Sequence, residues 1–148
     1  KILIIIFTFL MISNCGYSPI YSNKNFNFDL NKITKKENTR LNSKLIKSLR
    51  NFSNKDNENK LDVKIDSKKI VNIIAKNKKG DPSRYEMTIS MNVLVINNIG
   101  RSNKKSFSSS FNYNTDTNKF RLSQYEKEIE GLLIQKIIED CIIYFSKI

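Results

Sequence analysis

Apolar and polar residues alternate along most of this chain, and the period of the alternation changes from one segment to the next. Residues 26–31 read Phe, Asn, Phe, Asp, Leu, Asn, which is the period of two that is typical of a half-buried strand. Across residues 41–52 the apolar positions recur every three or four residues. The pattern therefore predicts a strand followed by an amphipathic helix, with Asn38 and Thr39 as candidates for its N-cap.

The middle of the chain predicts three strands joined by two short turns. Residues 61–75 form a long strand with an irregularity at residues 67–69, and Gly80-Asp81-Pro82 marks the turn that follows. Residues 84–96 carry the cleanest alternation in the chain and are predicted to be the central strand. A second turn at residues 97–100 leads to a fourth strand that contains Phe107, Phe111 and Tyr113.

From Phe120 to the C-terminal residue the apolar period becomes helical. This longest element is expected to pack against the sheet through one broad stripe. The residues of that stripe are Leu122, Tyr125, Ile129, Leu132, Leu133, Ile137, Cys141, Tyr144 and Ile148.

The predicted order β-α-β-β-β-α indicates an α+β fold. A helix between the first two strands permits a right-handed parallel crossover, whereas the two short turns require antiparallel hairpins. We therefore expect a two-layer sandwich, with a four-stranded mixed sheet and two helices on one face, formed by a single domain at residues 26–148. The other sheet face is polar and is left for water or for a partner.

The N-terminal region has a different character, and Cys15 marks the change. Residues 2–12 are almost all apolar, which is too short to span a bilayer but fits the central part of a secretory signal, with Lys1 before it. Three interpretations remain: a lipoprotein signal (1–14) that leaves Cys15 acylated, a plainly cleaved signal, and a buried helix. The first makes residues 15–25 a tether, and several acyl chains on one Cys suffice for stable anchoring.

Composition narrows the function. The 148 residues carry a formal charge of +12, no His and only two Cys. Neither a structural zinc site nor a Cys-His nucleophile can be assembled from these residues, and no catalytic constellation is found, so we expect no enzyme activity, no metal and no cofactor. The charge favours an anionic partner. For an exported chain this means a phosphate-bearing lipid rather than nucleic acid, with a merely solvated surface as the alternative.

Several short motifs, in their order and spacing, resemble the LptE family of lipopolysaccharide-assembly lipoproteins. They are Cys15-Gly16-Tyr17-Ser18-Pro19-Ile20-Tyr21 after the signal, Asp81-Pro82-Ser83-Arg84-Tyr85 at the entry to the central strand, and Phe111-Asn112-Tyr113-Asn114 at the end of the fourth strand. The predicted order of elements agrees with this family, and the resemblance covers essentially the whole chain after the signal.

The resemblance implies a protein held by its lipid anchor on the periplasmic face of the outer membrane. It implies a plug and assembly partner for the barrel LptD, which binds lipopolysaccharide during delivery to the cell surface. The alternative is a generic outer-membrane lipoprotein that acts as an assembly chaperone or structural subunit without a lipid ligand. Cations near the turns are the candidates for contact with lipid phosphates, although solvated turns explain them equally well: Lys78, Lys79, Arg84, Arg101, Lys104 and Lys105.

Overall fold

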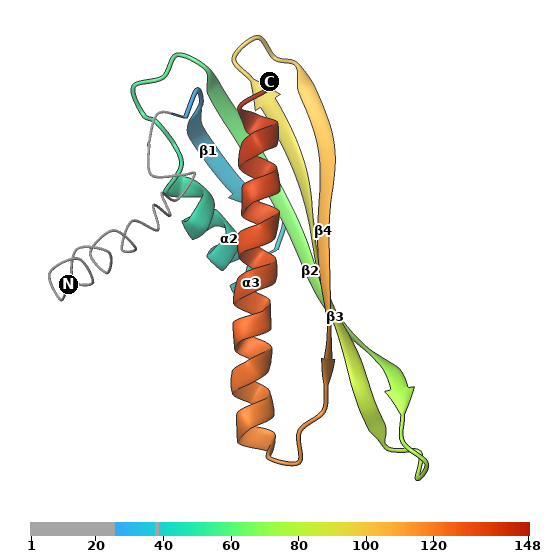
Figure 1. Cartoon of the computed structure of the whole chain (residues 1–148). Coiled ribbons are helices and arrows are strands. Elements are labelled where there is room, and N and C mark those ends of the chain that lie inside the picture. Colours follow the sequence, from blue (N-terminus) through green and yellow to red (C-terminus); the bar gives the residue numbers. More distant parts are fainter. Residues whose placement is uncertain (1–25, 38) are drawn as a thin grey trace, which may run out of the picture.

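The computed structural model describes residues 26–37 and 39–148, which form a four-stranded sheet with two helices packed on one face (Figure 1). The predicted α+β class and order of elements are confirmed. The predicted signal, tether and acylated Cys15 lie outside the described residues. The elements are β1 (Asp29–Lys35), α2 (Arg40–Arg50), β2 (Lys60–Lys76), β3 (Pro82–Asn97), β4 (Ser102–Asn114) and α3 (Lys119–Phe145).

The strands lie side by side in the order β1-β2-β3-β4. β1 pairs with β2 in parallel, and the two later hairpins are antiparallel, as the lengths of the connections predict. β1 begins at Asp29, three residues later than the alternation of residues 26–31 suggests. β3 has a neighbour on both sides, which confirms it as the central strand.

A single apolar core lies between the sheet and the helices. On β3 every second residue from Met87 to Val95 is buried, and these side chains face α3. Phe28, just before β1, packs edge-on against Phe145 at the end of α3, with ring centroids 5.5 Å apart. This contact ties the beginning of the described chain to its end. Cys141 is buried in the same core.

The irregularity predicted at residues 67–69 is wrong. β2 pairs with β3 without a register shift through this region, and the shifts occur near the turn, between Ile73 and Lys76. The apolar alternation stops at residue 67 because the helices supply polar partners there. Ser67 Oγ donates a hydrogen bond to Asn42 Oδ1 of α2, and Lys69 Nζ donates one to Glu130 of α3 at 2.7 Å.

The apolar stripe predicted on α3 is correct in part, but it does not coincide with the whole buried face of the helix. Leu132 is 62% exposed and lies outside the buried face, whereas Tyr125 is partly exposed but packs edge-on against Tyr113 of β4. The missed half of the buried face consists of Ile134, Ile138, Ile142 and Phe145. None of the helices in the described part of the chain is both long and apolar enough to cross a membrane.

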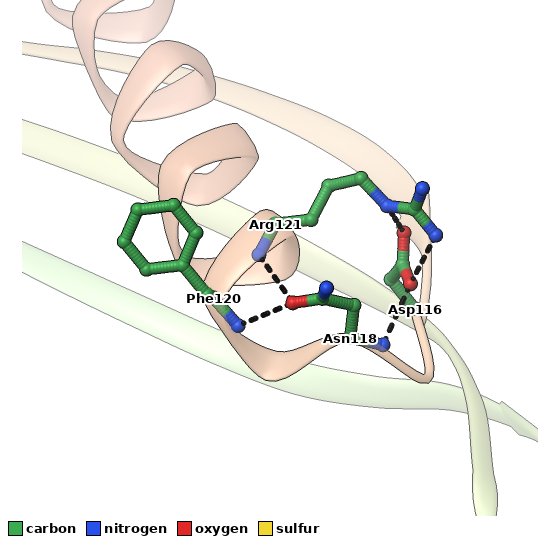
Figure 2. A network of polar contacts seen from close by, with 4 residues as sticks. All are labelled: Asp116, Asn118, Phe120 and Arg121. Carbon is green, nitrogen blue, oxygen red and sulfur yellow. Dashed lines mark hydrogen bonds and ion pairs between the residues drawn. The ribbon is translucent and has the colours of Figure 1, made fainter.

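Side-chain caps define where both helices begin. Thr39 accepts a hydrogen bond from the Asn42 backbone at 3.1 Å, as predicted; Asn38 lies outside the described residues. Figure 2 shows the corresponding cap of α3, where Asn118 Oδ1 accepts from the backbone N–H groups of Phe120 and Arg121. A hydrogen-bonded ion pair joins the Arg121 side chain to Asp116 and keeps the pKa of Asp116 below its ordinary value.

Two carboxylates on α3 connect this helix to the rest of the fold. Glu130 receives Lys44 of α2 on one oxygen and Lys69 of β2 on the other. Burial alone would raise the pKa of Glu130, but the hydrogen bonds from the two lysines outweigh it, so the pKa lies below its ordinary value. Glu126 accepts from the Tyr113 hydroxyl of β4 at 2.7 Å. α3 is thus held by polar contacts to α2, β2 and β4.

We expect Phe145→Ala to lower the free energy of unfolding by about 3–5 kcal/mol, because the ring is fully buried and its removal leaves a cavity beneath Phe28. Chemical denaturation measures this loss. Phe120→Ala is the matched control on the same helix. Phe120 is 73% exposed, so its removal is expected to change stability by less than about 0.5 kcal/mol. Equal losses for the two variants would contradict the assigned core.

We expect Glu130→Gln to destabilise the fold by about 1–3 kcal/mol at neutral pH, because two lysines lose their charged acceptor. Since the folded-state pKa is lowered, the wild-type contribution is fully present above the ordinary glutamate pKa, about 4.3, and is lost as the pH falls through the folded-state value. The variant should therefore lose less stability than the wild type on acidification. Glu128→Gln, at an exposed position on α3, is the control. A wild-type-like acid profile for Glu130→Gln would contradict the stabilising role assigned to Glu130.

Candidate functional site

The sheet face opposite the helices is uncovered in the described part of the chain (Figure 1). On β3 the even-numbered residues from Arg84 to Ile96 point to this open face, because the odd-numbered ones between them fill the core. Their neighbours on β4 are mostly Ser, Asn and Lys. The prediction of one apolar and one polar sheet face is confirmed.

The six cations proposed from the sequence fall into two groups at opposite ends of the sheet. Lys78, Lys79 and Arg84 lie at the β2–β3 turn, whereas Arg101, Lys104 and Lys105 lie at or beyond the β3–β4 turn. β3 connects the two turns with 16 residues, which corresponds to about 50 Å at a rise of about 3.3 Å per residue (Figure 1). No single phosphate group can contact both groups of cations.

The β2–β3 turn is organised by Asn77 rather than by its lysines. Asn77 Oδ1 accepts from the backbone N–H groups of Lys79 and Asp81, each at 2.9 Å. Gly80 has a φ of +87°, a conformation that side-chain-bearing residues rarely adopt. Nearby, Arg84 Nε donates to Asn114 Oδ1 at 3.3 Å. This turn therefore presents Lys78 and Lys79 to solvent.

At the other end, Lys104 and Lys105 contribute to a cavity of about 400 Å³ on the open face. Strand register explains the arrangement. Leu94 of β3 lies between Lys64 of β2 and Lys104 of β4, and adjacent strands are about 4.8 Å apart, so the two lysine side chains stand on either side of an apolar residue. The remaining lining residues are Lys36, Ile65, Asp66, Asn92, Val93 and Ser106.

A smaller hollow of about 200 Å³ continues from this cavity toward β1, and it shares Lys64 and Leu94 with it. Lys32 of β1 and the exposed side chain of Ile96 border this second part. We call the combined surface the open-face basin. It has an apolar floor of Leu94 and Ile96, and its basic rim consists of Lys32, Lys36, Lys64 and Lys104. Lys105 lies opposite the core-facing Val93, so its side chain points to the helix side of the sheet.

The charge of the open-face basin is largely uncompensated. Lys36 forms an exposed ion pair with Asp66 at 3.3 Å, and Asp62 accepts a hydrogen bond from Asn31 at 2.9 Å. Within residues 26–37 and 39–148, no ion pair is recorded for Lys32, Lys64 or Lys104. Ammonium groups around an apolar floor can donate charge-assisted hydrogen bonds to a phosphate while the floor contacts hydrocarbon.

Of the cations on the rim of the open-face basin, the sequence predicted Lys104 but not Lys32, Lys36 or Lys64. A signal for Lys64 was present, since it is the outward residue between Val63 and Ile65 in the alternation. The alternation says nothing about which strands are neighbours. Only the observed register brings Lys64 and Lys104 to the two sides of Leu94.

Three further observations concern the chemistry that the described residues can support. Burial raises the pKa of the Cys141 thiol well above its ordinary value, so this sulfur stays protonated inside the core. Among the described residues, no three His, Cys, Asp or Glu side chains lie close enough together to hold a metal ion. A hollow of about 620 Å³ between α2 and α3 is mainly apolar, with Phe52, Ile134 and Ile138 in its lining.

No protein-family model matches the sequence, and comparison with curated proteins gives no significant match. Solved structures do match. The rare lipoprotein B from Shewanella oneidensis is similar with a TM-score of 0.55 at 15% identity, over 76% of this chain and 89% of that one. A minor lipoprotein from Acinetobacter baumannii has a TM-score of 0.60 at 8% identity, over 82% and 92%.

A third structure, that of lipoprotein B from Nitrosomonas europaea, has a TM-score of 0.53 at 11% identity and covers 82% of this chain and 80% of that chain. At these low sequence identities, the similarity concerns the fold alone. Rare lipoprotein B belongs to the LptE family, so the resemblance predicted from the sequence motifs is confirmed at that level. The chain has the fold of these bacterial lipoproteins.

Proposed function

We propose that this chain is an outer-membrane lipoprotein, anchored through Cys15, that binds lipopolysaccharide and serves as the plug and assembly partner of an LptD-like barrel. The observation that carries the lipid-binding part is the open-face basin, in which lysines surround Leu94 and Ile96 on an uncovered sheet face. The likeness in fold to rare lipoprotein B supports the lipoprotein part.

Lipopolysaccharide combines phosphate groups with acyl chains, and the open-face basin offers a partner for each. Lys64 and Lys104 reach phosphate oxygens from opposite sides, whereas Leu94 contacts the hydrocarbon next to the phosphate. The sheet holds the lysine backbones in place, so only the side chains lose freedom on binding. This mechanism is non-enzymatic, because it needs only phosphate contact and release.

The lysines of the open-face basin are expected to dominate binding to purified lipopolysaccharide. Lys64→Gln combined with Lys104→Gln should weaken the affinity about tenfold, or about 1.4 kcal/mol, because two charge-assisted contacts are lost. Lys119→Gln with Lys127→Gln removes the same charge from α3 and should change the affinity less than about twofold. Lys78→Gln with Lys79→Gln tests the other end of the sheet.

Fluorescence titration at several salt concentrations measures these affinities. Equal losses for the variants in the basin and on α3 would show that binding follows net charge alone and not the open-face basin. Undetectable binding by the wild type would favour the lipoprotein without a lipid ligand, which is the alternative from the sequence.

The anchor and the barrel partner are tested together by purifying the tagged full-length protein from its native outer membrane. We expect an intact mass that begins at Cys15 with acyl chains, and a large β-barrel protein that copurifies. The Cys15→Ala variant should lack the mass of the acyl chains and should move from the membrane fraction to the soluble fraction, since anchoring depends on those chains. A wild-type protein that is neither acylated nor bound to a barrel would contradict the proposal.

A further inference from the structure

The second half of β2 exposes apolar side chains where no helix covers it. Ile70, Val71, Ile73 and Ile74 are between 38% and 50% exposed. Val71 and Ile73 point to the helix side of the sheet, while Ile70 points to the open face. Exposed apolar surface of this kind often marks an interaction site.

This segment is also the free edge of the sheet. Pairing of β1 with β2 ends at Lys35, opposite Ile65. The Ile65 carbonyl faces the β1 side, because it accepts from the Lys36 N–H at 2.9 Å. Backbone groups of every second residue point to the same side of a strand. The outward-facing groups beyond Ile65 therefore belong to Ser67, Lys69, Val71 and Ile73, and no described strand pairs with them.

The chemical groups along this edge indicate what kind of molecule can bind there. A lipid chain would cover the isoleucines but leave the outward N–H and C=O groups without partners. A second copy would bring its own residues 67–76 alongside, and these contain Lys68, Lys69 and Lys76 but no acidic residue, so like charges would meet across the new pairing. Each copy also carries a formal charge of +12. An extended segment of another protein, apolar at its centre and acidic at its ends, satisfies the backbone, the side chains and the flanking lysines.

We propose that the β2 edge from Ser67 to Ile73 binds such a segment by adding it to the sheet as a fifth strand. The register shifts between Ile73 and Lys76 limit the length of the pairing, because bulges end regular strand contacts. Lys68 and Lys76 disfavour cationic strands, and charged side chains of this kind are a usual protection of a free edge. This inference is independent of the proposed lipid ligand.

Hydrogen exchange read by NMR tests the proposal on the full chain in a mild detergent. The probe is a synthetic peptide, acetyl-Glu-Glu-Val-Thr-Ile-Thr-Val-Glu-Glu-amide, and its control replaces every Glu with Lys. In the free chain the amides of Lys69, Val71 and Ile73 should exchange fast, whereas those of Ile70 and Asn72, which face β3, should exchange slowly. The acidic peptide should slow the three outward amides at least tenfold, and the basic peptide should not.

Variants distinguish strand addition from other contacts. Val71→Pro removes an N–H that faces outward and leaves the pairing with β3 intact, so the fold should persist while protection by the peptide is lost. Val71→Thr keeps the N–H and should keep the protection. Ile99→Lys, at an exposed position of the β3–β4 turn, should behave like the wild type.

Each contrary result overturns the proposal. Outward amides that are already protected in the free chain would mean that this chain or a second copy occupies the edge. Equal protection by both peptides would show that the edge does not select an acidic partner. No protection by the acidic peptide would show that the edge does not bind an added strand. Unchanged protection in a folded Val71→Pro variant would do the same.

Discussion

The packing of α3 against the central strand is the contact on which the rest of the structure depends. The buried face of α3 meets the alternate residues of β3 between Met87 and Val95, and α2 completes the same layer over β1 and β2. A single layer of helices can cover only one face of a sheet. The polar character of the opposite face follows from this, and so does its availability for a ligand.

The sheet extends farther than the layer of helices, and this difference leaves the second half of β2 exposed. The β2–β3 hairpin projects beyond the helices, with α3 over the β3–β4 side of the sheet (Figure 1). Where helices lie above β2, its helix-facing residues bond to them, as Ser67 does to Asn42. Beyond that point Val71 and Ile73 lose their cover while the strand pairing with β3 continues.

Much of this fold follows from local patterns, because the period of apolar residues depends on the geometry of each element. The alternation of β3 predicted its central position, and Thr39 predicted the start of α2. Patterns failed where a polar residue had a tertiary partner. Lys69 looked like a break in a strand because its carboxylate, Glu130, lies 61 residues away in the sequence. The open-face basin could not be predicted in full for the same reason, since it depends on register across three strands.

Two parts of one strand thus have different roles. Up to Ile65, β2 is flanked by β1 and β3. The side chains of Lys64 and Asp66 point to the open face and line the open-face basin. From Ser67 onward the strand keeps β3 but has no described neighbour on its other side. A ligand on the face of the sheet approaches perpendicular to the strands, whereas an added strand approaches within the plane of the sheet. The two binding modes therefore do not compete for space, and both can be occupied while the pairing of β2 with β3 stays unchanged.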